Sequence, residues 1–165
     1  MPVKDLRRRR RVPHMAYANL QSRAPILVVD DSPEMRRYLR ALLELDSYRV
    51  MTAGDGFEAL QLLRLGCAPA VVLLDLQMPG MDGLETLRQL RELRPAPRVI
   101  LCSGVEDPAK MREAIALGAE AYLIKPIQHL YLSAAIERCV QKHNVTRPAE
   151  RHGSRLFVVP SPSLM

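Results

Sequence analysis

Short apolar runs divide the middle of the chain, and four of them stop at a polar residue. These runs cover 26–29, 71–74, 99–102 and 121–124, and the residues that follow them are Asp30, Asp75, Ser103 and Lys125. Continuous apolar runs of this length are typical of strands buried on both faces of a parallel sheet. A fifth, less regular run lies between the first two. We therefore predict strands at 26–30, 48–53, 70–75, 98–102 and 121–124.

The segments between these runs have the periodicity of amphipathic helices. In the first of them, Met35, Leu39 and Leu43 recur at helical spacing, and Ser32 before Pro33 is a favoured helix start. Similar stripes follow each of the other runs. We therefore predict helices at 33–45, 56–66, 84–94, 107–117 and 127–142.

The strict alternation of strand and helix predicts a parallel sheet with helices on both faces. There is room for five strands, but not for the six of a full dinucleotide-binding fold. The length of 165 residues and the 48% hydrophobic fraction fit one globular domain. No apolar stretch approaches the ~20 residues that cross a membrane, so we predict no membrane span.

The net charge of +6 is concentrated at the N-terminus. Residues 1–24 hold seven basic residues and one acid, which gives +6, whereas the other 141 residues hold 17 of each sign. The five consecutive arginines at 7–11 and the scarcity of large apolar residues predict a disordered arm. No aromatic residues interleave with these arginines, so we expect at most weak, sequence-independent nucleic-acid binding. Met15 is an alternative start that would remove the run.

The C-terminal segment 144–165 is rich in proline and serine, and we predict a flexible tail. Within it, residues 156–159 form a short apolar island that could dock on the body, bind a partner or remain exposed. The three widely spaced cysteines, Cys67, Cys102 and Cys139, predict buried thiols in a reducing compartment, which favours a cytoplasmic location.

Three aspartates carry the first chemical signal. The carboxyl ends of parallel strands meet at one edge of a sheet, where such folds bind ligands. Asp30, Asp31 and Asp75 would therefore lie together, and three adjacent carboxylates repel one another unless a proton or a cation neutralises them. Carboxylates are the protein ligands of Mg²⁺, with phosphate oxygens completing its shell. A carboxylate can also act as a nucleophile toward phosphorus.

The set Asp30–Asp31, Asp75, Ser103 and Lys125–Pro126 resembles the receiver domain of two-component response regulators, in the stand-alone form similar to chemotaxis regulators. The loop 75–83, DLQMPGMDG, looks like the loop that follows the third strand in that family. The resemblance covers residues 25–143. It implies a flavodoxin-like (βα)5 fold with strand order 2-1-3-4-5, flanked by the arm 1–24 and the tail 144–165.

The resemblance also implies a role for each acidic residue. Asp75 would be the phosphoacceptor. Asp31 would bind Mg²⁺ directly, Asp30 mainly through water, and the backbone carbonyl of Gln77 would be a further ligand.

The remaining motif residues would act on the phosphoryl group and on the signal. Ser103 would hydrogen-bond the phosphoryl group and Lys125 would pair with it. Tyr122 would act as a switch that turns inward on phosphorylation, and the alternative is a strand aromatic packed at the sheet edge. The Lys125–Pro126 bond is expected to be cis. The output face would be formed by the elements at 107–117, 121–124 and 127–142.

These observations predict a single-domain response regulator. It would take a phosphoryl group from a histidine kinase or a phosphotransfer protein and signal through protein contacts, because only about 22 residues follow the receiver region 25–143. It would not be an enzyme beyond slow self-phosphorylation and self-dephosphorylation. Two alternatives stay open, a phosphorylation-independent adaptor with a receiver fold and a phosphohydrolase that forms an aspartyl phosphate. The second would need a D-x-D motif and a cap domain, whereas here the two aspartates are adjacent.

Overall fold

The computed structural model describes residues 24–141 and 157–159. Its strands are β1 (Ile26–Val29), β2 (Val50–Ala53), β3 (Val71–Asp75), β4 (Val99–Ser103), β5 (Ala121–Ile124) and β6 (Phe157–Val159). Its helices are α2 (Pro33–Leu45), α3 (Gly56–Arg64), α4 (Gly83–Glu92), α5 (Pro108–Ala116) and α6 (His129–Gln141). The N-terminal arm lies outside the described residues.

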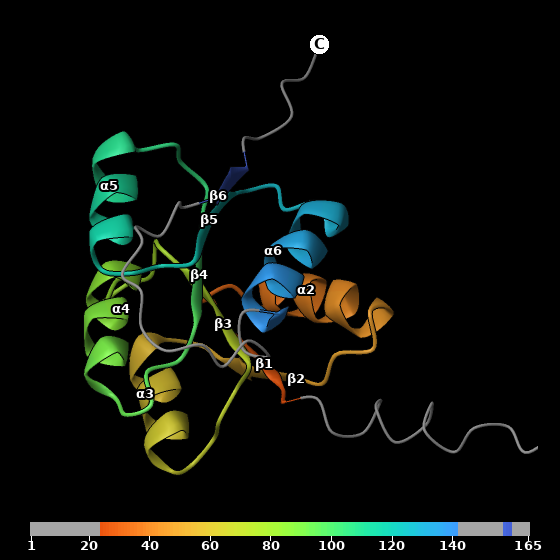
Figure 1. The fold of residues 1–165 in the computed structure, drawn as a ribbon, viewed down its shortest axis with the longest axis horizontal. Helices are drawn as coiled ribbons and strands as arrows, with labels where there is room; N and C mark the ends of the chain where they lie inside the picture. Colours follow the sequence, from red (N-terminus) through yellow and green to blue (C-terminus); the bar gives the residue numbers. More distant parts are fainter. Residues whose placement is uncertain (1–23, 142–156, 160–165) are drawn as a thin grey trace, which may run out of the picture.

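The strands form one parallel sheet in the order β2-β1-β3-β4-β5-β6 (Figure 1). The first five strands have the predicted order 2-1-3-4-5 and alternate with five helices, so the flavodoxin-like prediction is confirmed. The sixth strand was not predicted. It comes from the apolar island near the C-terminus and extends the sheet beside β5.

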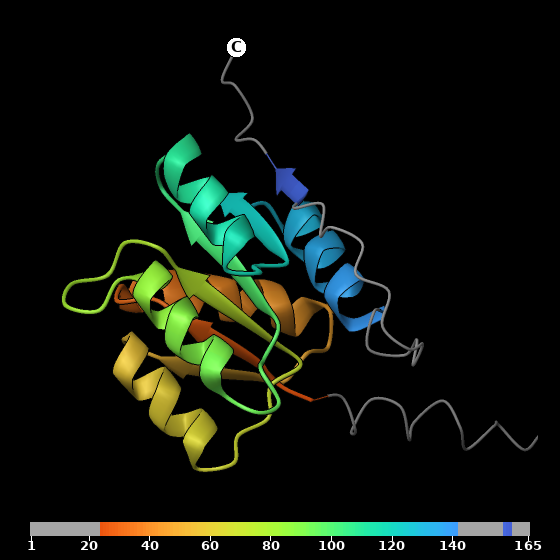
Figure 2. The same cartoon turned by 60° about the vertical axis from the view of Figure 1, so that its left-hand side comes forward.

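Helices cover both faces of this sheet, with α2 and α6 on one side and α3, α4 and α5 on the other (Figures 1 and 2). Side chains alternate along each strand, so each central strand feeds two cores. In β1, Leu27 and Val29 pack on the α3–α5 side, whereas Ile26 and Val28 pack on the α2–α6 side. All four residues are almost completely buried, which explains the unbroken apolar run.

The helix starts follow the predicted capping chemistry. The side chain of Ser32 accepts a hydrogen bond from the backbone N–H of Met35, with Pro33 at the first helical position. Aspartate side chains cap the next three helices in the same way, and these caps are Asp55, Asp82 and Asp107. Each cap fixes where the chain turns from the sheet edge into a helix.

Some predicted boundaries are wrong by a few residues. The second strand begins at Val50 rather than at residue 48, because Tyr48 instead packs into the core beside α2. The last helix begins at His129 rather than at residue 127. Cys102 and Cys139 are buried, as predicted, whereas Cys67 is partly exposed. No helix in the described ranges combines the length and the apolar character that a bilayer span requires.

Candidate functional site

The alternation of side chains sorts the predicted site residues into two groups. Asp30, Asp75 and Lys125 each stand two positions beyond a strand residue whose side chain packs toward α2 and α6. Those strand residues are Val28, Leu73 and Leu123. The three charged side chains therefore share one side of the sheet edge. By the same reasoning, Ser103 and Tyr122 belong to the opposite side, where Leu101 and Tyr122 pack with α3–α5.

The first group is held together by ion pairs. The Nζ of Lys125 lies 2.9 Å from Oδ2 of Asp30 and 2.9 Å from Oδ1 of Asp75. The two carboxylates are almost fully buried, and the lysine side chain is 19% exposed. One ammonium therefore bridges two carboxylates that come from neighbouring strands. We call Asp30, Asp75 and Lys125 the carboxylate–lysine cluster.

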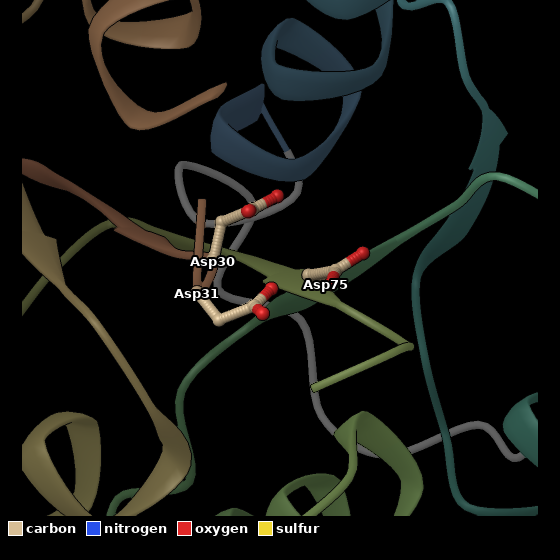
Figure 3. Close-up of side chains that lie close together, drawn as sticks. All are labelled: Asp30, Asp31 and Asp75. Atoms are coloured by element: carbon tan, nitrogen blue, oxygen red, sulfur yellow. The ribbon is translucent and has the colours of Figure 1, made fainter. Parts of the chain in front are cut away.

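A third carboxylate joins this cluster from the solvent side. Asp31 is exposed, and one oxygen from each of Asp30, Asp31 and Asp75 can be chosen so that all lie within 4.8 Å of one another. Figure 3 shows Asp30 and Asp31 after β1 and Asp75 at the end of β3, with the three side chains close together. Three hard oxygen donors with one of them open to solvent fit the ligand chemistry of Mg²⁺.

Burial and charge act in opposite directions on this cluster. Burial raises the pKa of the Asp75 carboxyl above its usual range, the hydrogen bond and charge of Lys125 oppose this rise, and the neighbouring Asp30 adds to it. For Lys125, burial disfavours the ammonium, but the hydrogen bonds and charges of the two aspartates outweigh burial and raise its pKa. The lysine therefore stays protonated at neutral pH, and it compensates only one of the two buried negative charges.

Backbone and neighbouring side chains fix the orientation of Asp30. Its Oδ1 accepts a hydrogen bond from the N–H of Ser32 at 2.9 Å, and its main-chain carbonyl accepts one from the guanidinium of Arg36 at 2.6 Å. Arg36 is a residue that the sequence reasoning missed. A basic residue one turn into the first helix is common, and no sequence pattern marks its backbone acceptor.

The second group is a network of uncharged hydrogen bonds. The hydroxyl of Ser103 donates to the carbonyl of Val105 at 2.8 Å and accepts from the N–H of Val105 at 3.1 Å. The phenol of Tyr122 donates to the same carbonyl at 3.4 Å. Both side chains are completely buried, whereas Val105 is exposed. We call Ser103, Tyr122 and Val105 the hydroxyl cluster.

This arrangement places the Tyr122 side chain inside the protein. Burial raises the pKa of its phenol, and the ring packs in the α3–α5 core. The structure thus holds the Tyr122 side chain in an inward position. The Lys125–Pro126 peptide bond is cis, as expected. Gln77 is exposed, and its backbone N–H opposes the rise in the pKa of the Asp75 carboxyl.

The start of α4 lies against the backbone of Asp75. A side chain added at Gly83 would place its Cβ 2.3 Å from the Asp75 carbonyl oxygen, well inside van der Waals contact. The Gly83 N–H also donates to the carbonyl of Leu76 at 3.0 Å. This close approach requires glycine and fixes the end of β3, where Asp75 projects its carboxylate.

A flavodoxin-like sheet whose first five strands have the order 2-1-3-4-5, with an acidic cluster at its carboxyl edge, defines the class of this protein. A sequence model of the response regulator receiver domain matches residues 26–137. The chain therefore belongs to the receiver domain family of response regulators. The match ends before β6.

Individual relatives agree with this assignment. The chain is 38% identical, over 137 residues, to the positive alginate biosynthesis regulatory protein of Pseudomonas aeruginosa, in a match that covers 78% of this chain and 54% of that protein. It is 34% identical to the chemotaxis protein CheY of Halobacterium salinarum, over 62% of this chain and 85% of that protein. The chain spans about half the length of several curated relatives that it matches.

Solved structures show the same fold. A response regulator receiver domain protein from Clostridium thermocellum superimposes with a TM-score of 0.69 at 33% identity, covering 73% of this chain and 97% of that chain. Response regulator signalling is thus the class of process to which the chain belongs.

Proposed function

We propose that the chain accepts a phosphoryl group on Asp75 from a histidine kinase or a histidine phosphotransfer protein. The observation that carries the proposal is the pairing of the buried Asp75 carboxylate with Lys125 beside two further carboxylates. A carboxylate oxygen of Asp75 forms a bond to phosphorus while the P–N bond of the donor phosphohistidine breaks, and the released imidazole takes up a proton. Transfer of this kind depends on positioning and charge compensation.

Lys125 would pair with the transferred group and Ser103 would hydrogen-bond it. Each change would alter a bond present in the structure, since Lys125 now bridges Asp30 and Asp75 and Ser103 now binds Val105. The donor set suits Mg²⁺, with Asp30, Asp31, Asp75 and the carbonyl of Gln77 as its ligands. When bound, Mg²⁺ would supply the positive charge that the lysine alone does not provide to the carboxylates and phosphoryl oxygens.

The signal would leave through protein contacts on the face formed by α5, β5 and α6. Ser103 and Tyr122 contact the Val105 carbonyl in the loop before α5, while Lys125 continues directly from β5. Changes at the two clusters would therefore reach this face. A cytoplasmic location fits such a partner set.

Chemical phosphorylation tests the acceptor. Acetyl phosphate with Mg²⁺ should add one phosphoryl group to the wild-type chain, detected by intact mass, and none to Asp75→Asn. Asp82→Asn is the matched control, because asparagine caps α4 as well as aspartate does and the position is exposed. Phosphoryl retained on Asp75→Asn would assign the acceptor to another residue. A wild-type chain that is never modified would favour the phosphorylation-independent adaptor.

Titration with Mg²⁺ tests the donor set separately. Asp31→Asn should weaken Mg²⁺ binding, followed by calorimetry, by at least about tenfold. Mutating a residue that only supports a metal ligand typically lowers metal affinity by about tenfold or more, and removing the ligand itself should lower it at least as much. Glu58→Gln serves as the control, since Glu58 is exposed, accepts a hydrogen bond from the Gly54 N–H and is not part of the carboxylate group. Equal Mg²⁺ affinities for the two variants would refute the proposed ligands.

A further inference from the structure

The C-terminal strand β6 lies on the outer edge of β5. The two strands run parallel, with Ala121 paired to Phe157, Tyr122 to Val158 and Leu123 to Val159. Figures 1 and 2 both show β6 at the end of the sheet, beside β5. The strand lies outside residues 26–137, which the receiver family matches. It is therefore an addition of this chain to the family fold.

Without β6, β5 would be an edge strand with a free row of backbone donors and acceptors. The direction of each donor follows from the alternation along a parallel strand. Lys125 N–H donates to the carbonyl of Ser103, the last residue of β4, so Ala121 and Leu123, which precede Lys125 at two-residue spacing, also point their N–H groups toward β4. The N–H of Tyr122 then faces the opposite way, toward β6. This amide marks whether the outer edge is occupied.

The composition of β6 suits this position. Its sequence, Phe-Val-Val, consists of an aromatic and two β-branched residues, the types enriched in strands. The α6 helix lies between β5 and β6 along the chain, which provides the long connection that a parallel pair requires. Three residues form a short strand, and strands of this length contribute few ladder bonds. The edge is therefore filled by a segment that a longer strand could replace.

The edge also adjoins the face through which we propose that the signal leaves. β5 lies between α5 and α6 in sequence, and both helices carry exposed apolar side chains, among them Ile115 and Leu130. A partner strand paired with β5 would continue the sheet at this edge. Strand addition to an exposed edge is a general mode of peptide recognition.

We propose that the outer edge of β5 is a strand-addition site for an extended apolar segment of a partner protein, and that residues 157–159 occupy it in the same chain as a built-in competitor. Only the identity of this edge as part of the output face rests on the proposed function. The occupancy of the edge follows from the strand pairing alone. Partner binding requires release of β6. The C-terminal segment therefore lowers the apparent affinity of the partner for this edge.

Two truncated chains that differ by three residues test the occupancy. One ends at Val159 and keeps β6, and the other ends at Leu156 and lacks it. In the shorter chain, amide hydrogen exchange of Tyr122, followed by NMR, should accelerate by at least about tenfold. The Leu123 amide, which faces β4, should not change and serves as the internal control. Equal exchange of Tyr122 in the two chains would overturn the proposal.

The full-length chain and an added peptide complete the test. Val159→Pro should give the same fast Tyr122 amide as the shorter chain, because the register places the Val159 N–H opposite the Tyr122 carbonyl and proline lacks that N–H. A peptide of residues 154–162, added to the chain ending at Leu156, should restore slow exchange at Tyr122, whereas the peptide with proline at 159 should not. A peptide without effect would overturn the strand-addition site. A full-length dimer that becomes monomeric on truncation would overturn occupancy within the same chain.

Phosphorylation by acetyl phosphate separates this inference from the proposed function. Both truncated chains keep every residue of the Asp75 site, so both should be modified to the same extent. If neither is modified but the Tyr122 amide responds as expected, the acceptor proposal fails and the strand-addition site stands.

Discussion

The two clusters at the carboxyl edge of the sheet differ in the kind of interaction that holds them. The carboxylate–lysine cluster joins two buried negative charges to one ammonium, so it is one positive charge short. The hydroxyl cluster is neutral, and its serine and tyrosine share one backbone carbonyl. The first cluster can therefore respond to protons, cations and phosphoryl charge, whereas the second responds only to changes in geometry.

This difference suggests a division of labour within one site. A charge added at Asp75 changes the energy of the first cluster directly, because charges in a buried setting interact strongly. The second cluster would change only when the Ser103 hydroxyl gives up its hydrogen bonds to Val105 and binds the phosphoryl group instead. The clusters should thus differ in how their stability depends on pH and Mg²⁺, and four substitutions test this.

The largest effect should come from Lys125→Met. The substitution leaves Asp30 and Asp75 buried without a cation, which typically costs about 3 kcal/mol. Denaturation in urea without divalent ions should show this loss, and added MgCl₂ should recover more stability in the variant than in the wild type. Lys110→Met on α5 is the control, and neither effect is expected there. A loss that Mg²⁺ does not reduce would mean that Lys125 contributes mainly by packing.

Ser103→Ala should have the next largest effect, a loss of roughly 1.5 kcal/mol. The buried hydroxyl donates to and accepts from the same residue, so its removal leaves the Val105 groups without these bonds. The loss, measured by urea denaturation, should be the same with and without Mg²⁺, and it should not vary between about pH 5 and 8, where most proteins are most stable. A Mg²⁺-dependent loss would connect Ser103 to the charged cluster and break the comparison.

Asp75→Asn should act in the opposite direction and raise stability by about 1 kcal/mol at neutral pH. Because the folded-state pKa of Asp75 lies above the ordinary value of 3.8, its ionisation opposes folding. That cost is absent below the unfolded pKa and fully present above the folded pKa. The stability difference between variant and wild type, from thermal denaturation across pH, should therefore grow as pH rises and vanish in acid. A variant that is less stable at neutral pH would show that the pairing with Lys125 outweighs burial.

The smallest effect should come from Tyr122→Phe, about 0.5 kcal/mol. The phenol makes a long hydrogen bond of 3.4 Å, and phenylalanine keeps the ring that fills the core. Urea denaturation should resolve this small loss. A cost above about 2 kcal/mol would require a stronger hydroxyl contact than the structure contains.

Much of this arrangement could be predicted because apolar runs and strand ends obey simple geometry. Runs buried on both faces identify β1, β3, β4 and β5, and the residue after each run must lie at one edge of the sheet. The side-chain alternation adds further information. Lys125 and Tyr122 are three positions apart, and an odd separation along a strand puts two side chains on opposite faces of the sheet. The contact of Lys125 with both Asp30 and Asp75 agrees with this spacing.

Other features depend on contacts that no local pattern encodes. Arg36 binds a backbone carbonyl, and any residue type could supply that acceptor. The position of Tyr122 depends on whether the core leaves room for its ring, so the sequence could not distinguish the inward state from the outward one. The residues of β6 were noticed as an apolar island, but three residues do not specify whether they pair, or with which edge. The roles in metal binding and phosphoryl transfer stay predictions for all of the site residues, which are Asp30, Asp31, Asp75, Gln77, Ser103, Tyr122 and Lys125.

Gly83 has a consequence for how genetic variation in this chain should be interpreted. With only 2.3 Å between a would-be Cβ and the Asp75 carbonyl oxygen, every other amino acid forces the backbone apart at the end of β3. A saturation library selected for signalling would therefore retain glycine here as strictly as aspartate at 75. The causes differ, and protein abundance distinguishes them. Variants at 75 should accumulate as silent folded protein, whereas variants at 83 should disappear from the cell by degradation.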